Sequence, residues 1–180
     1  MNAVSAPFFE SLAALVAYPR QEVTPVVRAC LATLPSSLAD AAIPLERFAY
    51  AVATMPLDAL ANEYVRAFDF DPDCTLELGW HLFGESVERG GFLAEVRHDL
   101  ERAGLTEAEG LPDHLANLLP LLAREDPVKA AALASRIAPA ISLVRAALAE
   151  RHNPYVQVIA VIETAVSAID EGRTPEATTP

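Results

Sequence analysis

Ionisable side chains gather between residues 60 and 114 of this 180-residue chain. Paired carboxylates can act as general acid and general base, and histidine can transfer protons or bind a metal ion. The carboxylates in this segment include Glu63, Asp69, Asp71, Asp73, Glu77, Glu85 and Glu88. None of the chain's four histidines stands in an HxxH, HxH or HExxH spacing, so the pattern gives no reason to expect a metal site.

The same segment lacks a template for nucleophilic or phosphate chemistry. Ser86 lies in no GxSxG motif, and the neighbouring Glu85 and Glu88 would oppose formation of an alkoxide. We expect Ser86 to be the N-cap of a helix instead. The chain has no phosphate-binding glycine loop, and Trp80 is its only tryptophan, which disfavours a sugar site around a carboxylate pair. These patterns favour a surface that binds another protein over a catalytic centre.

The charge balance excludes several classes of partner. The chain has 13 basic and 25 acidic residues and a net charge of −12. A protein that follows a phosphate backbone needs a basic surface, so we expect no nucleic-acid partner and no adsorption to anionic lipid. The acidity favours solubility and basic partners. No run of about 18 uncharged apolar residues is present, so we expect no direct membrane insertion.

Two cysteines indicate the compartment. Cys30 and Cys74 are far apart and form no CxxC pair, which argues against a disulfide framework and a structural zinc site. We expect both to be buried free thiols in a reducing compartment. The N-terminus lacks the basic and apolar regions of a signal peptide. The sequence therefore predicts a cytoplasmic protein.

The composition predicts an all-α fold, because alanine and leucine dominate and β-branched runs are few. We expect a single-domain helical bundle of about 8–10 helices over residues 1–171, and a mobile tail over 172–180. The predicted helices span 6–18, 23–34, 44–53, 56–69, 73–84, 86–103, 112–124, 127–151 and 154–170.

Local signals add detail to this prediction. A short turn separates helices 127–151 and 154–170, so we expect them to be antiparallel neighbours. Gly104 is placed to end a helix in a left-handed conformation. The pair Gly90-Gly91 is interpreted as a place where helices pack closely.

Several motifs resemble those of a known family. They are Leu15-Val16-Ala17-Tyr18-Pro19, Tyr64-x-x-x-Phe68-Asp69, His81-x-x-Gly84-Glu85-Ser86-x-x-Arg89-Gly90, Leu111-Pro112-Asp113-His114-Leu115, and Ile137-Ala138-Pro139 followed by Pro154-Tyr155. In this order they resemble the nitrate reductase delta-chain (NarJ-type) chaperones, within the TorD/DmsD class of redox-enzyme maturation proteins. Trp80 and Phe83 stand where that family often has an acidic residue and a second histidine.

The resemblance implies a TorD-like, all-helical cytoplasmic chaperone without catalytic activity. Such a protein binds the N-terminal segment of a molybdenum-containing catalytic subunit, of nitrate reductase or a relative. It holds that client while the molybdenum cofactor, and often an iron–sulfur cluster, is inserted before membrane attachment or export. The resemblance therefore assigns the cofactors to the client and none to this chain, which would be a monomer or weak homodimer.

We interpret the segment as a groove that binds an amphipathic client helix. The candidate peptide-binding residues are Tyr64, Phe68, Asp69, Asp71, Trp80, His81, Phe83, Glu85, Glu88, Arg89 and His114. For Tyr64 and Phe68, packing in the core is an equal alternative, and we expect Arg89 to pair with Asp69 or Asp113. The two alternative functions are an enzyme that uses a carboxylate and histidine cluster around Asp69, Glu85 and His114, and a non-catalytic scaffold module.

Overall fold

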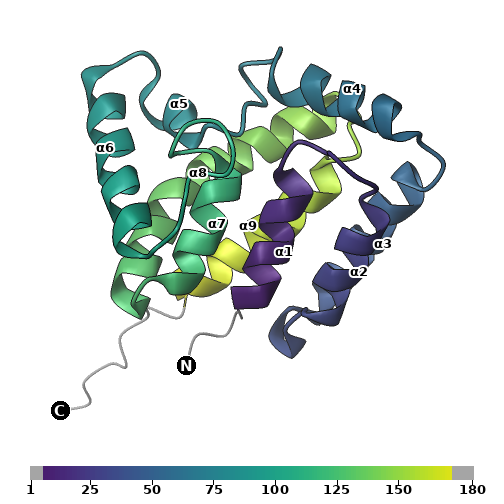
Figure 1. Ribbon diagram of the computed structural model, residues 1–180, viewed down its shortest axis with the longest axis horizontal. Coiled ribbons are helices and arrows are strands. Elements are labelled where there is room, and N and C mark those ends of the chain that lie inside the picture. The colour runs from purple at the N-terminus through teal and green to yellow at the C-terminus, as the bar shows by residue number, and fades with distance from the viewer. Residues whose placement is uncertain (1–5, 172–180) are drawn as a thin grey trace.

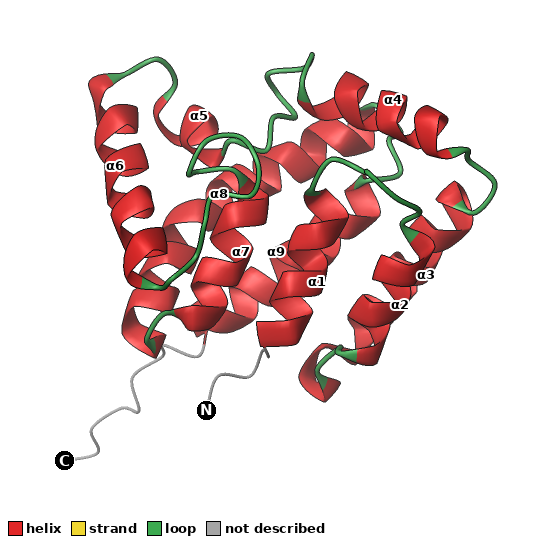
Figure 2. Ribbon diagram, in the orientation of Figure 1, coloured by secondary structure: helices red, strands yellow, loops and turns green. Residues whose placement is uncertain are grey.

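The structure is a computed structural model that describes residues 6–171. Within this range the chain forms nine α-helices, one 3-10 helix and no strand (Figures 1 and 2), so the predicted all-α fold is confirmed. The elements are α1 (Ala6–Val16), α2 (Thr24–Ala32), η1 (Ser36–Ala41), α3 (Ala42–Val52), α4 (Leu57–Phe68), α5 (Leu78–Phe83), α6 (Val87–Arg102), α7 (Leu115–Arg124), α8 (Pro127–Glu150) and α9 (Val156–Glu171). The tail predicted at 172–180 lies outside the described residues.

All nine predicted helices are present in order, but two of them begin three or more residues later than predicted. Helix α5 begins at Leu78 instead of residue 73, and α7 begins at Leu115 instead of residue 112. The two preceding segments bind each other, because Leu78 N–H donates to the Asp113 carbonyl (3.1 Å) and Leu115 N–H donates to the Leu76 carbonyl (2.8 Å). This long-range backbone pairing overrides local helix propensity. Sequence reasoning also missed the 3-10 helix η1.

The core is built around α8 and α9. These helices pack against each other, which confirms their prediction as neighbours, and α9 also contacts α1 and α3. Helix α4 lies across the end of the bundle near the α8–α9 turn (Figure 1). Aromatic rings make this contact, since the Tyr155 centroid lies 5.8 Å from Tyr64 and 5.1 Å from Phe68.

Helix α8 bears on the prediction that the chain does not insert into a membrane. Among the described helices, α8 alone is long and apolar enough to span a membrane. It also contacts α5, α7 and α9, and a core helix passes the same test of length and composition.

Cys30 and Cys74 are buried and unpaired, as predicted. Burial raises the pKa of Cys30 to about 12 and that of Cys74 to about 11, so both are unreactive at neutral pH.

The glycines have roles that differ from those expected. Gly104 follows α6 with a φ of 68°, as predicted. Gly90 and Gly91 are exposed, and an added Cβ would meet no atom within 4 Å, so their interpretation as a close-packing site is wrong. The close approach occurs at Gly79, where a Cβ would overlap Asp113 Oδ2 and lie 3.1 Å from the ring of Phe92.

This difference gives a paired test. We expect Gly79→Ala to lower the free energy of unfolding by about 1–3 kcal/mol, because the new methyl group displaces a buried carboxylate. Gly90→Ala lies in the exposed interior of α6 and is expected to raise it by about 0.5–1 kcal/mol. Denaturant unfolding of both variants measures the difference. Equal stabilities would contradict the assignment of Gly79 as the site of close approach.

Candidate functional site

Three adjoining cavities follow α4 along one side. The central cavity has a volume of about 520 Å³. It shares Tyr18 and Arg20 with a neighbour at the N-terminal end of α4, and Phe68, Asp69, Thr75 and Glu77 with a neighbour at the C-terminal end. We call the three cavities together the α4 groove.

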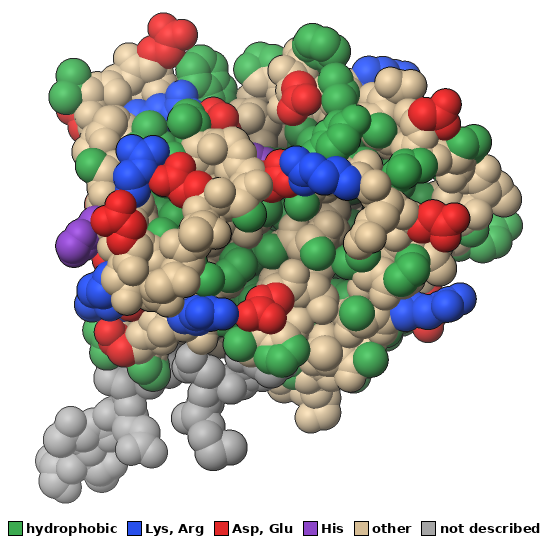
Figure 3. All heavy atoms as spheres, viewed as in Figure 1, with side chains coloured by type: hydrophobic (Ala, Val, Ile, Leu, Met, Phe, Trp, Pro, Cys, Tyr) green, Lys and Arg blue, Asp and Glu red, His purple; other side chains and the backbone are tan. Residues whose placement is uncertain are grey.

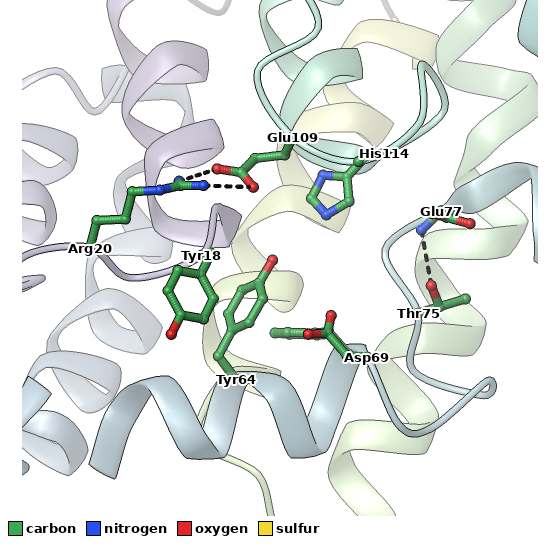
Figure 4. A pocket seen from close by; sticks show the side chains of 10 residues that line it. Tyr18, Arg20, Tyr64, Asp69, Thr75, Glu77, Glu109 and His114 are labelled. Carbon is green, nitrogen blue, oxygen red and sulfur yellow. Dashed lines mark hydrogen bonds and ion pairs between the residues drawn. The ribbon is translucent and has the colours of Figure 1, made fainter. Parts of the chain in front are cut away.

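Four segments of the chain supply the walls of the central cavity. Helix α4 contributes Tyr64 and Phe68, and the α4–α5 loop contributes Asp69, Thr75 and Glu77; the α1–α2 loop contributes Tyr18 and Arg20, and the segment before α7 contributes Glu109, Gly110 and His114. Figure 4 shows these side chains around one space, with Arg20 and Glu109 paired on one side of it. Residues that lie far apart in the sequence therefore form one site.

Asn117 fixes the loop that carries Glu109. Its side chain is buried, and its Nδ2 donates to the carbonyls of Glu109 (2.6 Å) and Leu111 (2.9 Å). Its Oδ1 accepts from Ala108 N–H at 2.8 Å. One amide thus bonds to backbone groups of three residues in a loop without regular structure, which holds the Glu109 backbone in place.

The floor of the central cavity is aromatic. The Tyr64 hydroxyl donates to the Val16 carbonyl at 3.0 Å, and its ring meets those of Tyr18 and Phe68 edge-on, with centroids 5.6 and 4.8 Å away. Tyr64 and Phe68 are each only 4% exposed. Both residues are therefore packed in the core, and both also line the central cavity.

Arg89 pairs behind the cavity. Its Nη2 donates to Glu77 Oε2 at 2.7 Å and lies 3.7 Å from Asp113 Oδ2. The predicted pairing of Arg89 with Asp69 or Asp113 is thus confirmed at Asp113, and Glu77 is a second carboxylate partner. Asp113 is fully buried, and its Oδ2 accepts from Gly79 N–H at 2.9 Å. Burial raises the pKa of Asp113, and the charge of Arg89 acts against that shift.

Asp69 is the carboxylate that remains available in the groove. It is exposed, and among the described residues it forms no ion pair. Desolvation raises its pKa, and the negative charge of Glu77 raises it further. Two carboxylates with mutual repulsion favour the approach of a cation.

Both histidines of the predicted set complete hydrogen bonds. His114 is the N-cap of α7, and its Nδ1 accepts from Ala116 N–H at 3.2 Å. Burial lowers the pKa of His114 to about 4, although the charges of Glu109 and Glu77 act to raise it. Its imidazole is therefore neutral at neutral pH. His81 Nε2 donates to the Thr75 carbonyl at 2.8 Å.

Six of the eleven predicted residues line the α4 groove. They are Tyr64, Phe68, Asp69, Asp71, Trp80 and His114. Asp71 also pairs with Arg151 at the end of α8. The ring of Trp80 lies 5.8 Å from the Arg89 guanidinium carbon. His81 and Arg89 bind residues of the groove wall without lining it.

The other three predicted residues lie elsewhere. Phe83 packs on Phe92, with ring centroids 5.6 Å apart, and on Arg136. Glu85 and Glu88 are exposed around the start of α6 and line none of the three cavities. Ser86 is the N-cap residue of α6, as predicted, but its side chain makes no capping hydrogen bond.

Sequence reasoning missed several groove residues. Tyr18 lies in the Leu-x-x-Tyr-Pro motif, so the sequence did contain a signal for it. Arg20 and Glu109 are 89 positions apart, and no local pattern indicates that they pair. Phe70, which lines the cavity at the C-terminal end of α4, is 79% exposed. An exposed phenylalanine beside a run of acidic residues is the signal that could have identified it.

The ionisable groups of the groove bear on the enzyme alternative. Within residues 6–171, no three His, Cys, Asp or Glu side chains are grouped closely enough to hold a metal ion. Of the cluster named for the enzyme alternative, Asp69 and His114 line the central cavity and Glu85 does not. The groove combines an aromatic floor with carboxylates at its rim, which suits binding of a cationic, amphipathic segment.

The neutral state of His114 gives a pH prediction. Its folded-state pKa of about 4 lies below its ordinary value of 6.5, so the unfolded chain takes up this proton first as the pH falls. Its contribution is complete above pH 6.5 and is lost towards pH 4, by about 3 kcal/mol at most. We expect His114→Asn, which keeps a neutral N-cap acceptor, to lose less stability over this range than the unsubstituted protein. Parallel curves of unfolding free energy against pH would contradict this prediction.

The sequence model of the nitrate reductase delta subunit family matches residues 31–160, a range that contains every residue of the central cavity except Tyr18 and Arg20. The chain is 33% identical over 123 residues to proteins named nitrate reductase molybdenum cofactor assembly chaperone NarJ, from Escherichia coli strains K12 and O157:H7. This alignment covers 67% of the chain and 52% of each relative, so the chain spans about half the length of those proteins. The match to most of the chain, together with the motifs, shows that this protein belongs to the nitrate reductase delta subunit family.

Proposed function

We propose that this protein is an assembly chaperone for a molybdenum-containing oxidoreductase, nitrate reductase or a relative. We propose further that its α4 groove binds the N-terminal segment of the catalytic subunit and holds it until the cofactor is inserted. Family membership supports the first statement, because the named relatives are molybdenum cofactor assembly chaperones. The observation that carries the second is the groove itself, with its aromatic floor and acidic rim.

The dimensions of the groove fit a helical segment. Helix α4 has 12 residues, which corresponds to a length of about 18 Å at 1.5 Å per residue. A client helix of similar length would lie along it. Apolar side chains line the groove from end to end, and they include Leu57, Ala61, Tyr18, Tyr64, Phe68, Phe70 and Trp80. A client with apolar residues on one helical face would bury them there.

The charges of the groove indicate the polar side of the client. Asp69 has no cation partner among the described residues, and Glu109 is paired only with the exposed Arg20. Complementary charge sets register and speeds encounter more than it adds affinity. A segment with basic residues beside its apolar face is therefore favoured. On the face in Figure 3, acidic and basic side chains stand side by side without a continuous basic surface, in keeping with a protein partner and not a nucleic acid.

The proposal assigns no cofactor and no catalytic step to this chain. Several ionisable groups around the groove already serve in structural bonds: Asp113 to Gly79, Arg89 to Glu77, and His114 to Ala116. Molybdenum and any iron–sulfur cluster would belong to the client. The proposed setting is the cytoplasm, with this protein acting as a monomer or weak homodimer before the client reaches the membrane or is exported.

Calorimetry with a synthetic peptide tests the proposal. The peptide carries the N-terminal segment of the molybdoenzyme catalytic subunit encoded beside this gene, and micromolar or tighter binding is expected. Trp80 is the only tryptophan and lines the cavity at the C-terminal end of α4. Its fluorescence emission is expected to change when the peptide binds. We expect Asp69→Lys to weaken binding by about tenfold, because it places a cation where the client cation binds.

Glu85→Lys is the matched control, since it makes the same charge change on an exposed residue outside the groove. Its affinity is expected to stay within about twofold of the unsubstituted protein at physiological salt. No binding of the peptide to the folded protein would overturn the proposal. Equal weakening by both lysine variants would remove the binding site from the groove.

A further inference from the structure

Resting on the proposed function, we infer that Arg20 is an internal substitute for a client side chain. Its guanidinium occupies a cation site formed by Glu109 and Tyr18 at the central cavity, and an arginine side chain of the bound segment takes this site in the complex. Arg20 is therefore an autoinhibitory residue that competes with the client for Glu109.

The geometry of the pair distinguishes a fixed partner from an exchangeable one. Both terminal nitrogens of Arg20 reach Glu109, with Nη2 3.5 Å from Oε2 (Figure 4). The Arg20 side chain is 65% exposed, whereas that of Glu109 is 14% exposed. The carboxylate thus belongs to the cavity wall, and the guanidinium approaches it from solvent.

The backbones of Glu109 and Arg20 also differ in how they are held. Asn117 donates to the carbonyl of Glu109 and also accepts from its N–H at 3.3 Å, which holds the backbone that carries the carboxylate. Arg20 lies in the loop between α1 and α2, and its contacts beyond Glu109 include the face of the Tyr18 ring, 5.7 Å from the guanidinium carbon. An ion pair with one largely exposed member contributes little net stability, so its exchange for a client cation is cheap.

The remaining charges favour such an exchange. Arg89, the other arginine near the cavity, is bound to Glu77 and faces the buried Asp113. His114 is neutral, because burial lowers its pKa. If Arg20 leaves, Glu109 and Asp69 lack a cation among the described residues. A fork of guanidinium donors matches a carboxylate better than an ammonium group does, so the site favours arginine over lysine.

Arg20 also lies at a junction. It lines both the central cavity and the neighbouring cavity that is bounded by Leu57 and Ala61. Movement of this side chain away from Glu109 would open the junction between these two cavities. The same movement therefore frees the cation site and lengthens the groove.

The test compares Arg20→Gln with Arg97→Gln. Arg97 is the matched control, because it pairs with Glu107 on the same loop (Nε to Oε1, 2.6 Å) and lines none of the three cavities. We expect Arg20→Gln to bind the client peptide roughly threefold to tenfold tighter, since it removes an internal competitor. Arg97→Gln is expected to leave the affinity unchanged. Equal or weaker binding by Arg20→Gln, relative to the control, would overturn the inference.

A second probe separates this inference from the proposed function. We expect N-acetyl-arginine methylamide to shift NMR signals of the central cavity in Arg20→Gln at millimolar concentration. The shifts should be absent in Arg97→Gln and in the double variant Arg20→Gln with Glu109→Gln, each confirmed as folded by its unfolding transition. Probe binding to Arg20→Gln without peptide binding to any variant would overturn the proposed function and support the cation site. Peptide binding without these probe shifts would overturn the cation site alone.

Discussion

The buried carboxylate of Asp113 is the group on which the groove depends. A carboxylate removed from water must find donors or cations inside the protein. Asp113 receives Gly79 N–H at 2.9 Å and faces Arg89 at 3.7 Å, and the backbone bonds beside it join the α4–α5 loop to the segment before α7. One charge thereby brings together three parts of the chain. Gly79 must be glycine for this contact, because a side chain would occupy the place of the carboxylate.

The same interaction sets the electrostatics of the groove. Arg89 cannot neutralise the open side of the cavity, since it is bound to Glu77 and Asp113 behind it. His114 contributes no positive charge. It is buried at the start of α7, and this burial lowers its pKa and keeps it neutral. Among residues 6–171, Asp69 has no ion-pair partner at the rim, and Glu109 has the exposed Arg20. The negative character of the groove thus follows from how its supporting residues are used.

Sequence reasoning predicted the helices well and the groove in part. The 3.6-residue periodicity and the proline signals are local, so the pairing of α8 with α9 could be predicted. The late starts of α5 and α7 could not be, because backbone bonds between distant segments decide them. Residue types alone also ranked Glu85 with Asp69, although one lies outside the groove and the other on its rim. Whether a residue just outside a helix faces a cavity depends on tertiary packing, which sequence spacing does not determine.

The proposed chaperone role requires release of the client as well as binding, and the groove as described separates these two requirements. The aromatic floor is rigid, since the Tyr64 hydroxyl is bound to Val16 and its ring packs against Tyr18, Phe68 and Tyr155. A preformed floor lowers the entropy cost of binding an apolar helix face. The rim is the exchangeable part in the inference drawn above, because the Arg20 side chain is exposed while Asn117 holds the backbone of its partner Glu109. An internal cation that returns to Glu109 as the client leaves would keep that carboxylate paired in both states, so that release exposes no unpaired charge there.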